Sequence, residues 1–168
     1  MSPSRMFKAY PTEGGIRAPL LVKVAGRPAD PGAMNDSFVH VRDIMPTLLD
    51  VAGVTAPEAI DGRKVLPMQG RSVLDFFAGK SKTAYAGASR VGYELFSFKA
   101  FIDGSWKIVR MPKPLGTGDW ELFDLSTDPA ELRDLSAEQP EKLEEMVALW
   151  NQYKENNGVL DIVPEVAK

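Results

Sequence analysis

The feature that most restricts the fold of this chain is a pair of alternating segments around an Asp-Gly dipeptide. Residues 96–102 and 106–111 alternate in the manner of two hairpin arms, and a period of two is typical of strands with one buried face. Asp103-Gly104 separates the arms and readily supplies the positive φ angles of a tight turn. The pattern predicts an antiparallel β-hairpin.

A further strand and a helix are predicted after the hairpin. Residues 120–125 form another apolar segment, and Asp128-Pro129 indicates a turn. From Pro140 to Gly158, apolar side chains recur at helical spacing; they are Leu143, Met146, Val147, Trp150 and Tyr153. The other face of this helix is too acidic for an anionic membrane surface, so we expect the apolar stripe to pack on the sheet.

The first third of the chain has the pattern of an α/β layer. Residues 20–24 are apolar enough for a strand that is covered on both faces. Asp43 is placed to cap a helix that continues to Ala52 and stops at Gly53. Frequent Pro and Gly residues follow, with one short helix expected at 71–78.

Composition argues against two classes of partner. The chain has 20 Lys and Arg residues against 23 Asp and Glu, a formal net charge of −3, and its basic residues are dispersed, so we expect no nucleic acid partner. No stretch approaches the roughly 20 apolar residues of a membrane span, so we expect no membrane partner. Cys is absent, which removes thiolate metal sites without identifying a compartment. We expect a soluble protein whose localisation, cytoplasmic or periplasmic, stays unknown.

Lys8 is the main candidate for a functional site. It stands five residues ahead of Glu13, which Gly14-Gly15 follows directly. Two consecutive glycines let the backbone turn tightly or approach a ligand closely, and a cation at this point is placed to face an anion. The alternative is that Lys8 is an ordinary solvated surface side chain.

Residues 7–19 read Phe-Lys-Ala-Tyr-Pro-Thr-Glu-Gly-Gly-Ile-Arg-Ala-Pro, and shorter segments follow at 43–50, 92–96, 104–107, 120–125 and 128–129. Together these segments resemble the type I sulfatases, especially the bacterial arylsulfatases, and cover nearly the whole chain. The first segment is fairly specific, and the later ones are specific in combination.

The resemblance implies a fold, an activity and a role for Lys8. The fold is α+β: residues 1–53 are the last strand and helix of a large α/β sulfatase domain, residues 54–89 a connecting loop region, and residues 90–168 a small antiparallel sheet of about four strands packed against a C-terminal helix. The family hydrolyses sulfate esters. The Lys five residues before Glu-Gly-Gly, here Lys8, contacts the sulfate group.

The catalytic nucleophile and the calcium ligands of the family have no counterpart in this sequence. The nucleophile is a formylglycine made from the Cys or Ser of a Cys-x-Pro-x-Arg motif, and the chain has no Cys and no matching Ser. The calcium ligands are Asp and Asn residues of the N-terminal domain, and His residues supply acid/base catalysis; only His40 exists here. We expect no metal and no cofactor in this chain, and calcium and formylglycine in the full-length enzyme.

Other residues have simpler explanations than a site. Glu94 is a weak candidate for contacting substrate, and a surface Glu near the start of a strand is preferred. Asp124 and Asp128 resemble a metal pair, but an Asx-type turn explains their spacing better. His40 stands between two Val residues on an apparent strand, so we expect it to face solvent or to be hydrogen bonded rather than to bind metal.

These observations favour the C-terminal segment of an arylsulfatase, which supplies Lys8 and structural support and is inactive in isolation. The alternative is a stand-alone interaction or structural module derived from a sulfatase tail. An anion-binding module centred on Lys8 is a third option, weakened because one Lys cannot neutralise sulfate alone and Arg17 is placed for a structural ion pair.

The expected partners follow from the favoured function. They are the missing N-terminal sulfatase part and a sulfate ester substrate. The isolated chain is also expected to self-associate, to swap strands, or to keep its first fifty or so residues poorly ordered, because residues 20–24 and 43–52 would lack their neighbours.

Overall fold

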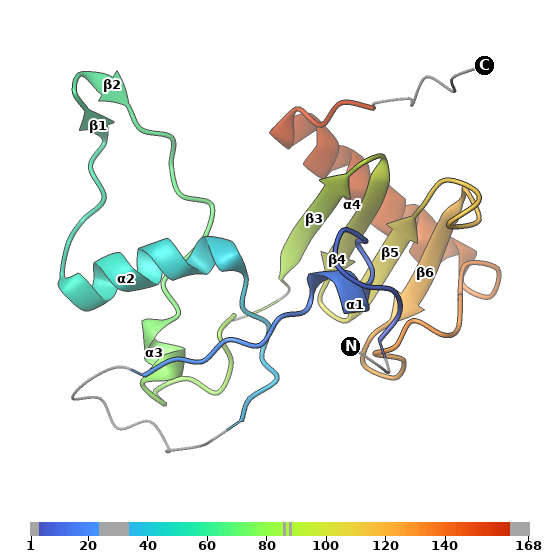
Figure 1. Cartoon of the computed structure of the whole chain (residues 1–168), viewed down its shortest axis with the longest axis horizontal. Coiled ribbons are helices and arrows are strands. Elements are labelled where there is room, and N and C mark those ends of the chain that lie inside the picture. The colour runs from blue at the N-terminus through green and yellow to red at the C-terminus, as the bar shows by residue number, and fades with distance from the viewer. Residues whose placement is uncertain (1–3, 24–33, 86, 88, 162–168) are drawn as a thin grey trace. The chain divides into compact units, whose positions relative to one another are not determined.

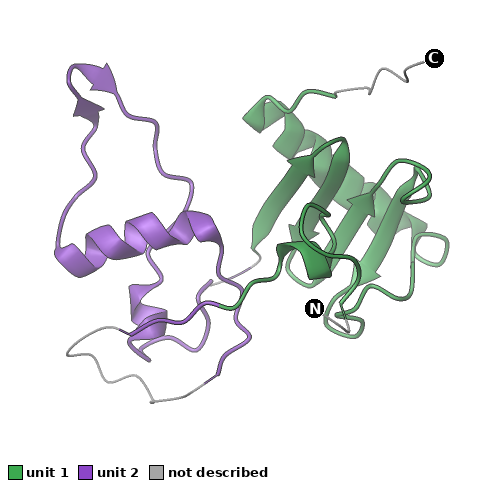
Figure 2. Cartoon of the chain, in the orientation of Figure 1, with its two compact units in different colours: residues 1–19, 88–168 green, residues 20–87 purple. Residues whose placement is uncertain are grey.

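The computed structural model describes residues 4–23, 34–85, 87 and 89–161 of the 168-residue chain. The chain forms two compact units, which Figure 2 distinguishes by colour. Unit 1 combines Met1–Pro19 with Ala88–Lys168, and unit 2 is Leu20–Gly87. The segment around Lys8 therefore belongs with the C-terminal sheet. The three-part division expected from the sequence stays a prediction for the complete protein.

Unit 1 is built on a four-stranded antiparallel sheet in the order β3-β4-β5-β6 (Figure 1). Its strands are β3 Arg90–Leu95, β4 Phe98–Asp103, β5 Trp106–Arg110 and β6 Trp120–Asp124. The strands follow one another in space as they do in sequence, so each pair is joined by a local connection. The predicted hairpin and the strand after it are confirmed.

The turns between the first three strands differ in detail from the sequence prediction. Asp103 pairs with Trp106 across the sheet, so the tight turn consists of Gly104, with φ of 63°, and Ser105. Phe96 and Ser97, expected to open the first arm, instead form the turn between β3 and β4 with φ angles of 51° and 68°. Positive φ angles at two consecutive residues are typical of a type I′ hairpin turn.

One face of the sheet is covered by α4 (Pro140–Asn157), the helix that the sequence predicted. It ends at Gly158, whose φ of 63° suits a left-handed C-cap. The core on this face is formed by Phe101, Ile108, Leu122, Met146 and Trp150. In Figure 1, α4 lies behind the strands.

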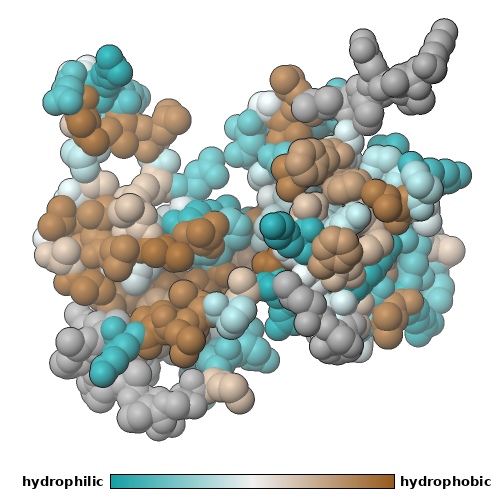
Figure 3. All heavy atoms as spheres, viewed as in Figure 1, coloured by the Kyte–Doolittle hydropathy of each residue, from teal (hydrophilic) through white to brown (hydrophobic). Residues whose placement is uncertain are grey.

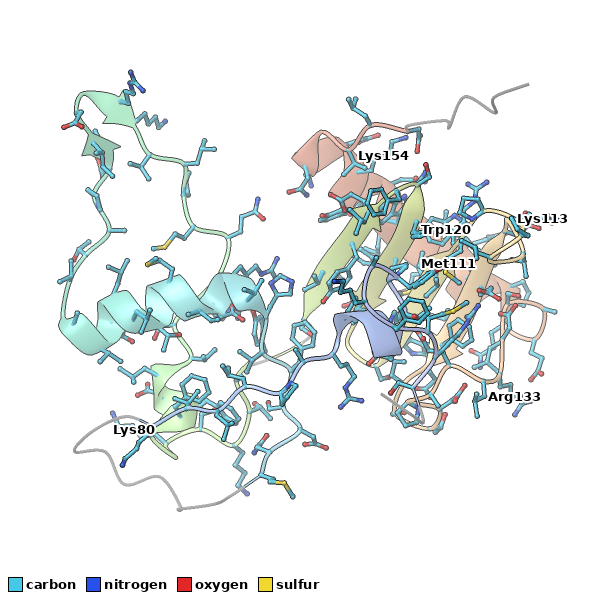
Figure 4. The ribbon with its side chains drawn as sticks, in the orientation of Figure 1. Lys80, Met111, Lys113, Trp120, Arg133 and Lys154 are labelled. Carbon is cyan, nitrogen blue, oxygen red and sulfur yellow. The ribbon has the colours of Figure 1, made fainter. Side chains whose placement is uncertain are left out.

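The N-terminal segment covers the opposite face. A second cluster of Ala100, Val109, Met111 and Phe123 packs against side chains that include Met6 and Tyr10. The short helix α1 (Glu13–Ile16) follows directly and lies in front of the strands in Figure 1. Figure 4 labels a side chain of each cluster: Met111 belongs to the cluster under the N-terminal segment, and Trp120 packs against the cluster under α4. The sheet thus has cores on both faces.

Unit 2 contains short elements around one longer helix. They are the 3-10 helix η1 (Val41–Asp43), α2 (Ile44–Ala52), β1 (Ala59–Ile60), β2 (Arg63–Lys64) and α3 (Leu74–Phe77). The predicted helix is confirmed and stops at Gly53, with φ of 66°. Asp43 does not cap α2 through its side chain. Its buried carboxylate instead accepts hydrogen bonds from the His40 N–H at 2.8 Å, the Arg71 N–H at 3.1 Å and the Tyr85 hydroxyl at 2.6 Å.

The strand expected at 20–24 is not formed where the structure describes it. Residues 20–23 carry no strand pairing, Leu21 is 97% exposed, and Val24 lies outside the described residues. An isolated strand leaves its backbone N–H and C=O groups unpaired, so an apolar run forms a buried strand only beside other strands. Within the described residues, no helix combines the length and apolarity required to span a membrane.

Candidate functional site

Lys8 lies in a tightly folded turn of the N-terminal segment. Met6 and Ala9, on either side of it, have φ angles of 59° and 81°. Residues other than Gly rarely adopt positive φ, and such a conformation persists where surrounding contacts impose it. The Lys8 side chain is exposed, and in the described part of the chain it takes part in none of the ion pairs. The turn therefore presents an available ammonium group.

The backbone after Lys8 folds back onto the residues before it. The Gly14 N–H donates to the Arg5 carbonyl at 2.9 Å, and the Thr12 hydroxyl donates to the same carbonyl at 2.8 Å. A Cβ atom at Gly14 would lie 2.3 Å from the Met6 carbonyl oxygen. The close approach predicted for the glycine pair is therefore made to the chain itself.

A buried ion cluster joins this segment to the sheet. The Lys107 Nζ of β5 is 2.8 Å from Oε1 of Glu13 and 2.8 Å from Oε1 of Glu131. The Lys107 side chain is 0% exposed. The second carboxylate oxygen of Glu131 accepts the Glu13 backbone N–H at 2.9 Å. Because a buried charge is costly unless it is paired and hydrogen bonded, these three residues depend on one another.

The loop after β6 holds Glu131 in an unusual backbone conformation. Glu131 has φ of 57° and is 3% exposed. Asp128 supports this loop, because its carboxylate accepts the Leu132 N–H at 2.7 Å and the Arg133 N–H at 2.8 Å. The loop is thereby shaped to place a carboxylate beneath α1.

Further contacts fasten both ends of the Lys8 segment. The Arg5 guanidinium is 3.0 Å from the Glu121 carboxylate and lies over the Phe123 ring at 5.6 Å. The Tyr10 ring stacks on Phe98 with centroids 5.3 Å apart. Arg17 lies 3.7 Å from Glu13, so the structural ion pair considered for Arg17 in the sequence is present.

Glu94 lies on the surface, as preferred, but near the end of a strand and not near its start. It lies on β3, is exposed, and accepts a hydrogen bond from the Tyr153 hydroxyl at 3.0 Å. This contact ties the sheet to α4. A substrate contact by Glu94 stays a prediction.

The structure favours the turn explanation of Asp124 and Asp128. The Asp124 carboxylate accepts the Ser126 N–H at 3.0 Å and the Ser126 hydroxyl at 2.7 Å, and these bonds lower the pKa of Asp124. Throughout residues 4–23, 34–85, 87 and 89–161, no group of three or more His, Asp or Glu side chains could hold a metal ion. The donors present there do not fit the calcium site that the resemblance implies for the full-length enzyme.

The His40 side chain is hydrogen bonded, which is one of the two states expected from the sequence. It precedes η1, and its Nδ1 accepts the Arg42 N–H at 3.2 Å. Burial lowers the pKa of His40, the charge of Arg42 lowers it further, and Asp43 opposes this shift. A ring nitrogen that accepts a backbone N–H at the start of a helix acts as a cap.

Lys107 and Glu131 are the residues that sequence reasoning missed. Lys107 closes one of the segments that resemble sulfatases, but a single Lys on a predicted strand is typical of a solvated face. One signal was available, because Lys107 shares its face of β5 with the buried Val109. No signal marked Glu131.

Comparisons with known proteins agree along nearly the whole chain. The model of the family described as "N-sulphoglucosamine sulphohydrolase, C-terminal" matches residues 5–157. In sequence the chain is similar to an uncharacterized sulfatase of Schizosaccharomyces pombe, with 36% identity over 160 residues that cover 95% of this chain and 28% of that protein. It is also similar to arylsulfatase K of Xenopus laevis, with 29% identity over 155 residues that cover 87% of this chain and 27% of that protein. The chain thus spans less than a third of these relatives.

A solved structure supports the fold. The chain is similar to a protein from the core genetic locus through which Bacteroides thetaiotaomicron metabolises multiple glycosaminoglycans, with a TM-score of 0.50 and 21% identity. The match covers 67% of this chain and 24% of that protein.

Proposed function

Since the chain belongs to the sulfatase family whose C-terminal region is described as "N-sulphoglucosamine sulphohydrolase, C-terminal", we propose that it completes the active site of a sulfuric ester hydrolase. The complete enzyme hydrolyses a sulfate ester. This segment contributes Lys8 and the sheet that supports it. The observation that carries the proposal is the exposed Lys8 in a turn that the sheet holds from below.

In this proposal, Lys8 binds sulfate oxygens and stabilises charge on the oxygen that leaves as the S–O bond breaks. A fixed ammonium in a site that excludes water is worth several times its value in bulk water, because the Coulomb energy scales inversely with the effective dielectric constant. Cores on both sides of the sheet keep the supporting strands rigid. Little reorganisation is then needed at the moment of reaction.

The nucleophile and the calcium ligands lie, in this proposal, in the part of the enzyme outside this chain. The sequence has no Cys, and the described residues lack a cluster suited to a metal. Lys8 alone supplies charge but no group that can attack sulfur. The isolated chain is therefore inactive.

Unit 2 offers the surface on which the rest of the enzyme docks. Leu48 on α2 is 57% exposed, and several apolar neighbours are exposed with it: Leu20, Leu21, Val22, Ile44, Met45 and Val51. Figure 3 shows hydrophobic residues gathered over α2. An exposed apolar patch of this kind marks an interaction surface. The missing N-terminal sulfatase part is the proposed occupant.

Kinetics of the complete sulfatase test the role of Lys8. Lys8→Ala should lower kcat by about 10²-fold or more with a smaller effect on ground-state binding, as for other transition-state charge stabilisers. Lys8→Arg should fail to restore activity, because a planar guanidinium does not reproduce a compact ammonium. Lys82→Ala, which removes an exposed Lys of unit 2, is the matched control. Full activity of Lys8→Ala would favour the alternative function, a non-catalytic module derived from a sulfatase tail.

A further inference from the structure

We propose that Lys107, with Glu131, is the positioning residue for Lys8. The proposal rests on the proposed function, in which the Lys8 ammonium must be held in one place. Lys107 lies 94 positions from its partner Glu13, yet its ammonium is the buried connection between the sheet and the N-terminal segment.

The cluster is balanced in charge. Lys107 pairs with the carboxylates of Glu13 and Glu131, and Arg17 pairs with that of Glu13. Glu131 holds Glu13 doubly, through the shared ammonium and through the Glu13 backbone N–H at 2.9 Å. Two contacts thereby tie the start of α1 to the rest of unit 1, one through the Glu13 side chain and one through its backbone N–H.

A short series of contacts carries this constraint from Glu13 to Lys8. Gly14, the next residue, is bonded to the Arg5 carbonyl. The Tyr10 N–H donates to the Phe7 carbonyl at 3.2 Å. These two bonds close the turn that contains Lys8 and its two neighbours of positive φ. If α1 detaches from Lys107, the Gly14 end of the turn is released, and the Lys8 ammonium is held less firmly by the remaining contacts of Arg5 and Tyr10.

A contribution to stability is a weaker explanation for the cluster. Burying an ammonium and two carboxylates costs solvation free energy that their attraction only roughly offsets, and apolar residues of similar volume often serve equally well. Buried ionic groups have their best-attested use in specifying one arrangement over others. Here the arrangement specified is that of the segment carrying Lys8.

Amide hydrogen exchange on the 168-residue chain provides the first test. Lys107→Met keeps the apolar stem and removes the charge, and Glu131→Gln is a milder change that keeps the shape. In both variants, exchange of residues 6–17 should accelerate at least about tenfold, while β4 and β5 keep their protection. Lys99→Met, the same substitution on the adjacent strand, should leave residues 6–17 unchanged. Unchanged exchange of residues 6–17 in Glu131→Gln with an intact sheet would overturn the proposal.

Kinetics of the complete sulfatase separate a positioning role from a purely structural one. Lys107→Met should lower kcat with little change in KM, as Lys8→Ala does. When Lys107→Met is added to Lys8→Ala, kcat should fall almost no further, because Lys107 acts through Lys8. The proposal would be overturned if Lys107→Met lowered kcat by the same factor in the Lys8→Ala variant as in the unmodified enzyme. If instead Lys8→Ala is fully active, the function proposed for Lys8 fails, and the exchange result still decides whether Lys107 positions the segment.

Discussion

Gly15 lies directly against the backbone of Tyr10: a Cβ atom at Gly15 would stand 2.0 Å from the Tyr10 carbonyl oxygen. At the neighbouring Gly14, a Cβ atom would stand 2.3 Å from the Met6 carbonyl oxygen and 2.4 Å from that of Arg5. Neither glycine has a positive φ angle. Glycine is therefore required at both positions because a side chain would overlap a backbone carbonyl, and not because of the backbone conformation. The pair lets α1 and the Lys8 turn share one compact structure.

Gly15→Ala should therefore release the N-terminal segment from the sheet. The added methyl group overlaps a backbone carbonyl that cannot move like a side chain, and overpacking of this kind costs about 1–3 kcal/mol. Amide exchange of residues 6–17 is the measurement. Gly53→Ala is the control, since a Cβ there has open space and meets only the strain of a φ of 66°. A Gly15→Ala variant with native protection in residues 6–17 would contradict the close packing.

Acidification should loosen the start of η1. The folded pKa of His40 lies below its ordinary value of 6.5, so the unfolded state binds the proton more readily. The stabilisation from neutral His40 is complete above about pH 6.5 and is lost as the pH falls through the folded pKa. Because His40 is the only His in the chain, an NMR titration of its ring protons reports on it without ambiguity.

His40→Asn is the matched variant for this titration. Asn is a good capping residue without a charge change in this range, so it should remove the pH dependence of the protection of residues 40–43, measured as the exchange rate relative to that of an unfolded peptide at the same pH. A His40 pKa at or above 6.5 would show that burial and Arg42 do not govern it.

The purified chain should show no turnover of an aryl sulfate above background, with or without calcium. It contains no Cys from which formylglycine could be made, and Lys8 supplies charge only. A nitrophenyl sulfate assay followed by absorbance measures this. Calcium-dependent turnover that copurifies with the chain would require a different mechanism.

The isolated chain should self-associate through α2. Leu48 and its apolar neighbours are exposed, and burying them against a second copy removes about 25 cal/mol of unfavourable hydration per Å². Light scattering over a concentration series measures the association. Leu48→Glu should abolish it, whereas Leu66→Glu, the same change at an 84% exposed Leu outside α2, should not. Equal behaviour of the two variants would argue against α2 as the contact.

Local patterns predicted β4, β5, β6, α2 and α4, but they did not predict β3 or α1. The apolar stripe of α4, the Gly158 C-cap and the hairpin around Gly104 are each determined by residues within a few positions of one another, and short-range geometry governs such features. The turn at Phe96 and Ser97 was missed because neither residue is typical of positive φ angles. Its two strands pair along their whole length, and that pairing outweighs the local preference.

Contacts between residues far apart in the sequence could not be predicted from the sequence. Periodicity identifies an apolar face but not what covers it, so the packing of Tyr10 on Phe98 was not foreseen. The same limit applies to residues 20–24, whose apolar side chains predicted a strand without showing whether a neighbouring strand exists. Lys8 was identified through resemblance, and the buried cluster beneath it became visible only in three dimensions.

The separation in sequence between Glu13 and its partners has a consequence for synthesis on the ribosome. Glu131 lies 118 positions after Glu13, so at 5–20 residues per second the N-terminal segment emerges on the order of ten seconds before that partner exists. The hairpins of the sheet need only neighbours in sequence and can form as they emerge. The segment that carries Lys8 thus leaves the ribosome before the loop that secures it, and it stays unattached in the nascent chain until the loop after β6 has left the exit tunnel.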